Sequence, residues 1–160
     1  MRGRAVRSRL FTPLAVIGVF LADRLSKLWV MEHFSYGEVR PLLPFFRLTY
    51  LENTGAAFSI GQGRNTALIV LSAAILVVLL AVERRMGPGR PGLRAGLGLV
   101  IGGALGNLYD RISYGSVIDF LDFFWGARHW PAFNLADAAI CVGAAGLLYF
   151  QRRSAGVPEP

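Results

Sequence analysis

The stretch that decides the fold is GLGLVIGGALGNLYDR, residues 96–111. It is apolar for most of its length, and Gly98, Gly102 and Gly106 recur at every fourth position. In a helix this spacing places the three glycines on one face, where two backbones inside a membrane can approach closely. The stretch therefore predicts a transmembrane helix at the centre of a bundle.

The rest of the chain supplies partners for such a helix. Of its 160 residues, 54% are hydrophobic and only 17% are charged, and the mean hydropathy is +0.46. A span requires roughly 20 mostly apolar residues, with about 17 at the short limit. Four runs reach or approach that length, at approximately residues 10–30, 66–82, 93–109 and 133–150. The sequence predicts an α-helical membrane protein with four transmembrane helices in a single domain, residues 1–160.

The net charge of +7 is concentrated on one side of this predicted membrane. Ten basic residues flank the ends of the spans on that side: Arg2, Arg4, Arg7, Arg9, Arg84, Arg85, Arg90, Arg94, Arg152 and Arg153. Only Glu83 and Glu159 oppose them there. Because basic loops remain in the cytoplasm, both termini are predicted to be cytoplasmic. The charge indicates topology and does not predict a nucleic-acid partner.

The two segments on the opposite side are longer and differ in character. Phe45–Leu51 is rich in aromatic and β-favouring residues, Asn53–Gly55 reads as a turn, and Ala56–Ile60 could return as a second strand. We therefore expect a small extracytoplasmic β-sheet at approximately residues 42–60. The other segment carries a cluster of aromatic residues, which predicts a short interfacial helix or loop. The cluster comprises Phe120, Phe123, Phe124, Trp125 and Trp130.

Two aspartates lie where a membrane makes a charge costly. Asp137 is followed by the apolar run AAICVGAAGLLYF, and Asp119 lies in GSVIDFLDFFW beside a second acid, Asp122. A carboxylate at membrane depth usually faces a protein interior or a wet cavity and is functional by default. Two of them held together could share a proton, as the acid and base of an aspartyl protease do. Spacing alone leaves open whether Asp119 or Asp122 is the partner of Asp137.

Other polar residues are predicted to reach the same depth as these acids. They lie near the outer ends of the first, third and fourth spans, or in the outer loop: Asp23, Lys27, Asn53, Asn107, Asp110, Arg111 and Asn134. This convergence predicts a single site just under the outer interface.

Each of these residues also has a structural interpretation. Asp23 and Lys27, four residues apart, could simply neutralise each other at a helix end. Asp110 and Arg111 could cap a helix and pair locally. Asn53 could act only as a turn residue, and Asn134 only at a helix start.

Five motifs in this order closely resemble the lipoprotein signal peptidase (signal peptidase II) family of bacterial inner-membrane aspartyl proteases. The matching segments cover nearly the whole chain: Asp23–Lys27, Asn53–Phe58, Gly102–Arg111, Gly115–Phe120 and Phe133–Asp137. One departure is Arg24, where the family often has glutamine.

The resemblance implies an enzyme of the inner membrane, with both termini cytoplasmic and its active site near the outer face. It implies that Asp119 and Asp137 are catalytic, that Asn53, Asn107, Arg111 and Asn134 support the pair or bind substrate, and that Asp23, Lys27 and Asp110 are structural. The expected substrates are lipid-modified prolipoproteins, cut on the amino side of the lipidated cysteine. We expect a monomer in contact with membrane lipids, with no metal and no cofactor.

Two other functions are compatible with buried aspartates. A small proton-coupled transporter would use Asp119 and Asp137 as a proton relay, with Lys27 or Arg111 as a gate. Such carriers often show internal repeats, and this chain shows none. A non-catalytic assembly subunit would use the glycine-lined helix for packing, which leaves the polar convergence without a purpose. Cleavage of a lipid-modified precursor distinguishes the peptidase from both.

Overall fold

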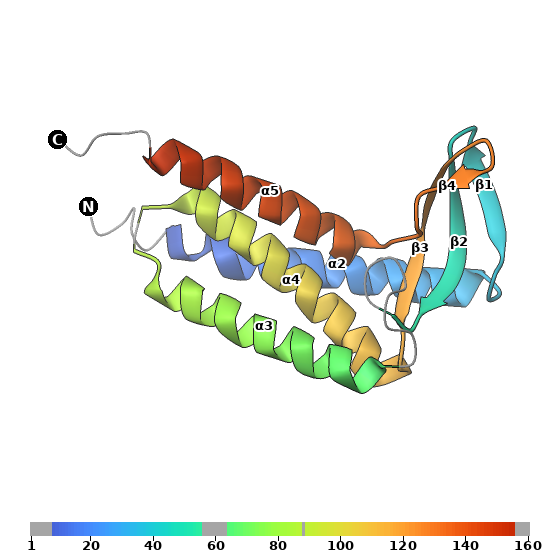
Figure 1. The fold of residues 1–160 in the computed structure, drawn as a ribbon, viewed down its shortest axis with the longest axis horizontal. Helices are drawn as coiled ribbons and strands as arrows, with labels where there is room; N and C mark the ends of the chain where they lie inside the picture. The colour runs from blue at the N-terminus through green and yellow to red at the C-terminus, as the bar shows by residue number, and fades with distance from the viewer. Residues whose placement is uncertain (1–7, 56–63, 88, 156–160) are drawn as a thin grey trace.

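The computed structural model describes residues 8–55, 64–87 and 89–155. Within these residues four helices run side by side, and an antiparallel sheet lies across one end of the bundle (Figure 1). The helices are α2 (Phe11–His33), α3 (Asn65–Arg85), α4 (Pro91–Tyr114) and α5 (Leu135–Ala155). Each covers one of the predicted apolar runs to within a few residues at either end.

Helix α4 lies at the centre of the bundle, in contact with α2, α3 and α5 (Figure 1). The predicted glycine face packs against α2. A Cβ added at Gly98 would lie 2.7 Å from the carbonyl oxygen of Thr12, and one at Gly102 would lie 2.9 Å from that of Val16. Gly103, on another face of α4, packs equally closely against α5. The glycines of α4 therefore allow its backbone to pack closely against both α2 and α5, whereas their spacing predicted close packing on one face only.

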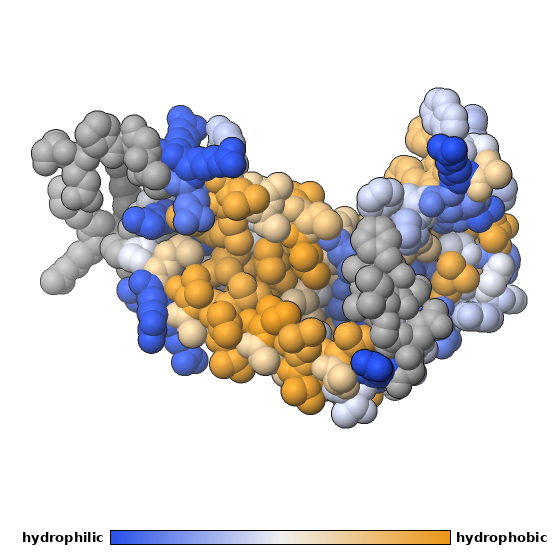
Figure 2. All heavy atoms as spheres, viewed as in Figure 1, coloured by the Kyte–Doolittle hydropathy of each residue, from blue (hydrophilic) through white to orange (hydrophobic). Residues whose placement is uncertain are grey.

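The outer surface of the helices is apolar. Figure 2 shows a broad hydrophobic band over the helices with hydrophilic residues at both ends of the molecule. Large side chains such as Leu14 and Val77 are each 66% exposed, which is unusual for a surface that faces water. Among the described residues one helix, α3, is long and apolar enough to cross a membrane by itself, with a hydropathy of 2.6 over its best window. Helices α2 and α4 bury charged residues, and α5 is rich in alanine and glycine, so their mean hydropathy is lower.

The sheet contains strands β1 (Val39–Leu43), β2 (Phe46–Asn53), β3 (Val117–Trp125) and β4 (Arg128–His129), in the order β1-β2-β3-β4. Strand β2 confirms the strand predicted at Phe45–Leu51. Strand β1 begins before the predicted β segment, and the second strand expected at Ala56–Ile60 lies outside the described residues.

Four of the five aromatic residues after α4 lie in strand β3, so the prediction of an interfacial helix or loop was wrong for them, whereas Trp130 follows β4 without regular structure. Helix α4 ends at Tyr114, and Gly115 adopts φ +77°, the left-handed conformation that commonly ends a helix. The chain then turns back into β3, which pairs with β2 so that Asp119 lies opposite Leu51. This pairing satisfies the backbone of both strands, and the local sequence could not show it because the two strands are far apart in the chain.

Candidate active site

Asn134 connects the two predicted catalytic aspartates. Its amide Nδ2 donates to Asp119 Oδ1 at 2.8 Å, and its Oδ1 accepts the backbone N–H of Asp137 at 3.0 Å. The second contact is a helix cap, because Asn134 immediately precedes α5 and Asp137 lies in its first turn. Asp137 Oδ2 in turn accepts the Asn134 backbone N–H at 3.4 Å, completing a reciprocal capping box. Asn134 is therefore both the N-cap residue of α5 and a hydrogen-bond donor to Asp119.

Asp119 is the more buried of the two carboxyl groups, with 3% of the residue exposed. Besides Asn134, it accepts a hydrogen bond from Asn53 Nδ2 at 3.1 Å. Asn53 also forms the predicted turn, because its Oδ1 accepts the Gly55 N–H at 2.9 Å. Burial raises the pKa of Asp119 to about 7, and the negative charge of nearby Asp137 acts in the same direction. Asp119 can therefore hold or lose a proton near neutral pH.

Asn107 on α4 fixes the carboxyl group of Asp137. Its Nδ2 donates to Asp137 Oδ1 at 2.7 Å, while its Oδ1 accepts from Lys27 Nζ at 3.1 Å and from Asn134 Nδ2 at 3.3 Å. Because Lys27 has only N–H donors, it requires the oxygen of the Asn107 amide to face it. The amide nitrogen must then face Asp137, so Lys27 sets the orientation of the group that holds this aspartate.

Next to the two aspartates lies a buried layer of four charged side chains from α2 and α4. Lys27 Nζ is 2.8 Å from Asp23 Oδ2 and 2.8 Å from Asp110 Oδ2, and Arg24 pairs with Asp110 Oδ1 at 2.5 Å. Asp23, Lys27 and Asp110 are fully buried. The two acids and two bases balance, as buried charges require. The ion pair of Asp23 with Lys27 is present, but Lys27 also pairs with Asp110, so the two residues do not simply neutralise each other. The local pair of Asp110 with Arg111 was wrong, because Asp110 pairs with Arg24 and Lys27 of α2.

This charged layer also accepts hydrogen bonds from the backbone next to each of the two aspartates. Asp23 Oδ1 accepts the N–H of Ala136 at 3.0 Å, and Asp110 Oδ2 accepts the N–H of Ile118 at 3.3 Å. Ala136 directly precedes Asp137, and Ile118 directly precedes Asp119. One ionic cluster thus positions α5 and β3 relative to each other. Neither contact could be predicted from the sequence, because both donors are backbone N–H groups, and the apolar side chains of Ala136 and Ile118 give no sign of them.

Arg111 lies beside the aspartates without a close ion pair to either. Its Nη2 donates to the Gly55 carbonyl at 2.6 Å, and its buried Nη1 has no hydrogen-bond partner among the described residues. Asn65, which the sequence reading did not single out, donates to the Arg111 carbonyl at 2.9 Å. Its only signal is a polar side chain just before a long apolar run. Arg111 therefore presents a buried N–H donor close to the turn formed by Asn53.

Asp122, the other possible partner of Asp137, lies in a different environment. It pairs with Arg47 at 2.5 Å and contacts His129 at 3.0 Å. No hydrogen bond joins it to Asn53, Asn134 or any other described residue of the cluster around Asp119. The geometry therefore separates two acids that their spacing could not distinguish.

Comparison with known proteins agrees with this arrangement of residues. The family model for signal peptidase (SPase) II matches residues 15–152. The lipoprotein signal peptidase of Shewanella pealeana is 50% identical over 145 residues, covering 88% of this chain and 85% of that protein. The lipoprotein signal peptidase of Shewanella loihica is 52% identical over 133 residues, covering 81% of this chain and 78% of that protein.

The fold is also similar to a solved structure. A bacterial membrane enzyme determined by the in meso method at 2.3 Å resolution superposes with a TM-score of 0.83 and 25% sequence identity, covering 91% of this chain and 89% of that chain. Its likeness extends over the helices and the sheet together, because so much of each chain is aligned. With a family model over most of its length and relatives about half identical to it, the chain belongs to the signal peptidase II family.

Proposed function

We propose that this chain is an aspartic endopeptidase that removes the signal peptide from diacylglyceryl-modified prolipoproteins, cutting on the amino side of the lipidated cysteine. Asp119 and Asp137 are the proposed catalytic pair. The observation that carries the proposal is that one side chain, Asn134, contacts both residues, beside a buried ionic layer. Because the negative charge of Asp137 disfavours ionisation of Asp119, the two carboxyl groups cannot easily both ionise, and the proposed pair holds one proton.

We assign the ionised role to Asp137 and the protonated role to Asp119. Asp137 lies in the first turn of α5, where the helix dipole favours a negative charge, and it accepts the amide of Asn107. Asp119 is buried in the sheet, and its pKa of about 7 favours a retained proton below neutral pH. This difference between the two environments is the basis of the proposed division into acid and base roles.

The chemistry follows from these two states. Asp137 takes a proton from a water molecule, whose oxygen attacks the scissile carbonyl carbon while protonated Asp119 hydrogen-bonds the carbonyl oxygen. When the tetrahedral intermediate collapses, the C–N bond breaks and the leaving nitrogen takes the proton that Asp137 accepted. Arg111 Nη1 supports the developing oxyanion, because it is a buried donor without a partner among the described residues. The scheme requires neither a metal nor a cofactor.

We further propose that all four helices cross the inner membrane, with the sheet and the active site near the outer face. The exposed apolar band over the helices supports this orientation (Figure 2), as does the placement of basic residues at the other end of the bundle. A lipid-bearing peptide then reaches the site laterally, and the aromatic residues of β3 lie at headgroup level. All the proposed site residues come from one chain, so a monomer contains the whole site.

The test is cleavage of a lipid-modified precursor by the purified protein. Asp119→Asn and Asp137→Asn should each abolish cleavage while the protein remains folded, because each removes one half of the proton transfer. Asp122→Asn is the matched control, since Asp122 lies on the same strand but contacts Arg47 and His129. Normal turnover by either of the first two variants, or complete loss in the control alone, would contradict the assignment.

A further inference from the structure

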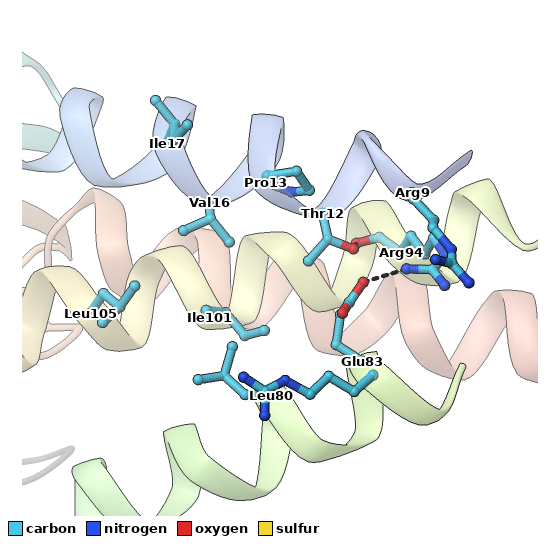
Figure 3. Close-up of a pocket in the computed structure, with 11 residues that line it drawn as sticks. Arg9, Thr12, Pro13, Val16, Ile17, Leu80, Glu83, Arg94, Ile101 and Leu105 are labelled. Atoms are coloured by element: carbon cyan, nitrogen blue, oxygen red, sulfur yellow. Dashed lines mark hydrogen bonds and ion pairs between the residues drawn. The ribbon is translucent and has the colours of Figure 1, made fainter. Parts of the chain in front are cut away.

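A groove of about 590 Å³ lies between α2 and α3 with α4 as its floor, at the end of the bundle away from the sheet. Its volume is in the range of small-molecule and cofactor sites. One part of the groove is apolar and runs along three helices (Figure 3). It is lined by Val16, Ile17, Leu80, Ile101 and Leu105. None of these residues belongs to the proposed active site, so the groove needs an explanation of its own.

The end of the groove nearest the start of α2 is charged. Arg9, Arg84 and Arg94 line it against a single acid, Glu83. In Figure 3 the guanidinium groups of Arg9 and Arg94 lie close together, and a dashed line marks the ion pair of Arg94 with Glu83. With three basic residues and one acidic residue, this end of the groove, called its mouth below, has a net positive charge, and the apolar part of the groove extends from it.

Arg94 supplies the observation that indicates a ligand. It is 2% exposed, and its guanidinium donates to the Glu83 carboxylate and to the Met86 carbonyl. Its Nε remains buried with no hydrogen-bond partner among the described residues. A buried donor without an acceptor is destabilising, and an acceptor on a bound molecule would remove that cost. Unlike Arg94, which pairs with Glu83, Arg9 and Arg84 have no ion-pair partner among the described residues.

We infer that this groove binds one anionic glycerophospholipid of the surrounding membrane. Its phosphodiester lies at Arg9, Arg84 and Arg94, and one acyl chain lies along the apolar part of the groove. Arginine is well suited to phosphate oxygens, and basic residues near an anionic leaflet attract such lipids. A free phosphate would leave the apolar part unused, and a basic peptide would be repelled by the mouth. The inference rests on the proposed membrane insertion and is independent of the two aspartates.

The experiment is native mass spectrometry of the delipidated full-length protein in neutral detergent, titrated with phosphatidylglycerol or phosphatidylcholine of identical acyl chains. The first phosphatidylglycerol should bind at least tenfold more tightly than phosphatidylcholine. The double variant Arg9→Gln/Arg84→Gln should lower the phosphatidylglycerol affinity about 30-fold, since each arginine near an anionic headgroup contributes about a factor of five. Both replaced side chains are exposed, so the variant should unfold at the wild-type temperature.

The matched control is Arg85→Gln/Arg90→Gln, which removes the same charge from exposed positions that do not line the groove. It should change the affinity less than twofold. Leu80→Trp, which fills the apolar part, should weaken phosphatidylglycerol binding, and inorganic phosphate at millimolar concentration should not displace the lipid. The inference is overturned if phosphatidylcholine binds equally well, if both arginine pairs cause the same loss, or if phosphate alone competes. Cleavage by the wild type continues in any of these cases, so the two proposals fail separately.

Discussion

Asn53→Ala should shift the alkaline limb of the pH profile of cleavage to higher pH. Asn53 Nδ2 donates a hydrogen bond to Asp119 Oδ2 at 3.1 Å, and this bond favours the ionised carboxylate. Removing the bond disfavours ionisation, so the pKa of Asp119 must rise further. Because the proposed mechanism requires Asp119 to be protonated, activity should then persist to a higher pH than in the wild type.

The magnitude follows from the strength of one hydrogen bond to a charged group. Such bonds contribute about 1.5–3 kcal/mol, and the partly exposed Asn53 side chain places this one near the lower figure. One pKa unit corresponds to about 1.4 kcal/mol, so the limb should move from about 7 to about 8. At pH 8 the wild type should keep about a tenth of its low-pH activity, and the variant about half of its own.

The assay is kcat/KM for a lipid-modified precursor between pH 5 and 9, because its pH dependence reports groups of the free enzyme. The position of the limb is the measured quantity, since the variant also loses the turn contact to Gly55 and its absolute rate can fall for that reason. Thr54→Ala, at an exposed neighbouring position, is the control and should leave the limb in place. A limb that stays at the wild-type pH in Asn53→Ala, or moves to lower pH, would refute the reasoning.

Three further predictions concern stability, each checked by thermal unfolding in detergent. Burial raises the pKa of Asp119 from 3.8 to about 7. Ionisation of Asp119 therefore destabilises the folded protein as the pH rises through this range. Asp119→Asn should raise the unfolding temperature at pH 8, and the gain should shrink toward pH 4. Gly106→Ala should cost about 1–3 kcal/mol because its Cβ meets the Asp23 carboxylate, whereas Gly146→Ala, with nothing within 4 Å, should be neutral or stabilise by up to about 1 kcal/mol. Lys27→Met should cost about 3–5 kcal/mol by leaving Asp23 buried without its cation, and adding Asp23→Asn should restore part of that loss.

The helices could be predicted because their signals are local. Apolar length and the spacing of Gly98, Gly102 and Gly106 depend only on neighbouring residues, and the structure confirms the central position of α4. The role of Gly103 was missed because its partner surface on α5 cannot be derived from periodicity in α4 alone. The strand prediction succeeded for β2, where aromatic and branched residues follow one another. It failed for β3, where the same aromatic residues also fit a membrane interface.

The sequence predicted which residues gather at the candidate site better than it predicted which of them contact one another. Topology alone predicted one depth for Asp119, Asp137 and Asn134, and in the structure Asn134 contacts both aspartates. Spacing alone could not distinguish Asp119 from Asp122, and the family resemblance supplied the preference for Asp119. The structure adds that Asp122 pairs with Arg47 and His129, which no local sequence signal indicates. The partners of Asp110 were predicted wrongly because its neighbour Arg111 was the nearest base in sequence, whereas α2 supplies the nearest bases in space.

The buried ionic layer has a consequence for how the chain is made. Asp23 and Lys27 belong to the same helix, so they can neutralise each other as soon as α2 forms. Arg24 must wait for Asp110, which is synthesised 86 residues later. Until α4 has been synthesised, α2 therefore carries one unpaired positive charge, on Arg24. This charge favours a polar environment for α2 until α4 emerges. A nascent chain stalled between these two helices should remain bound to its insertion machinery, and release should follow once the acid arrives.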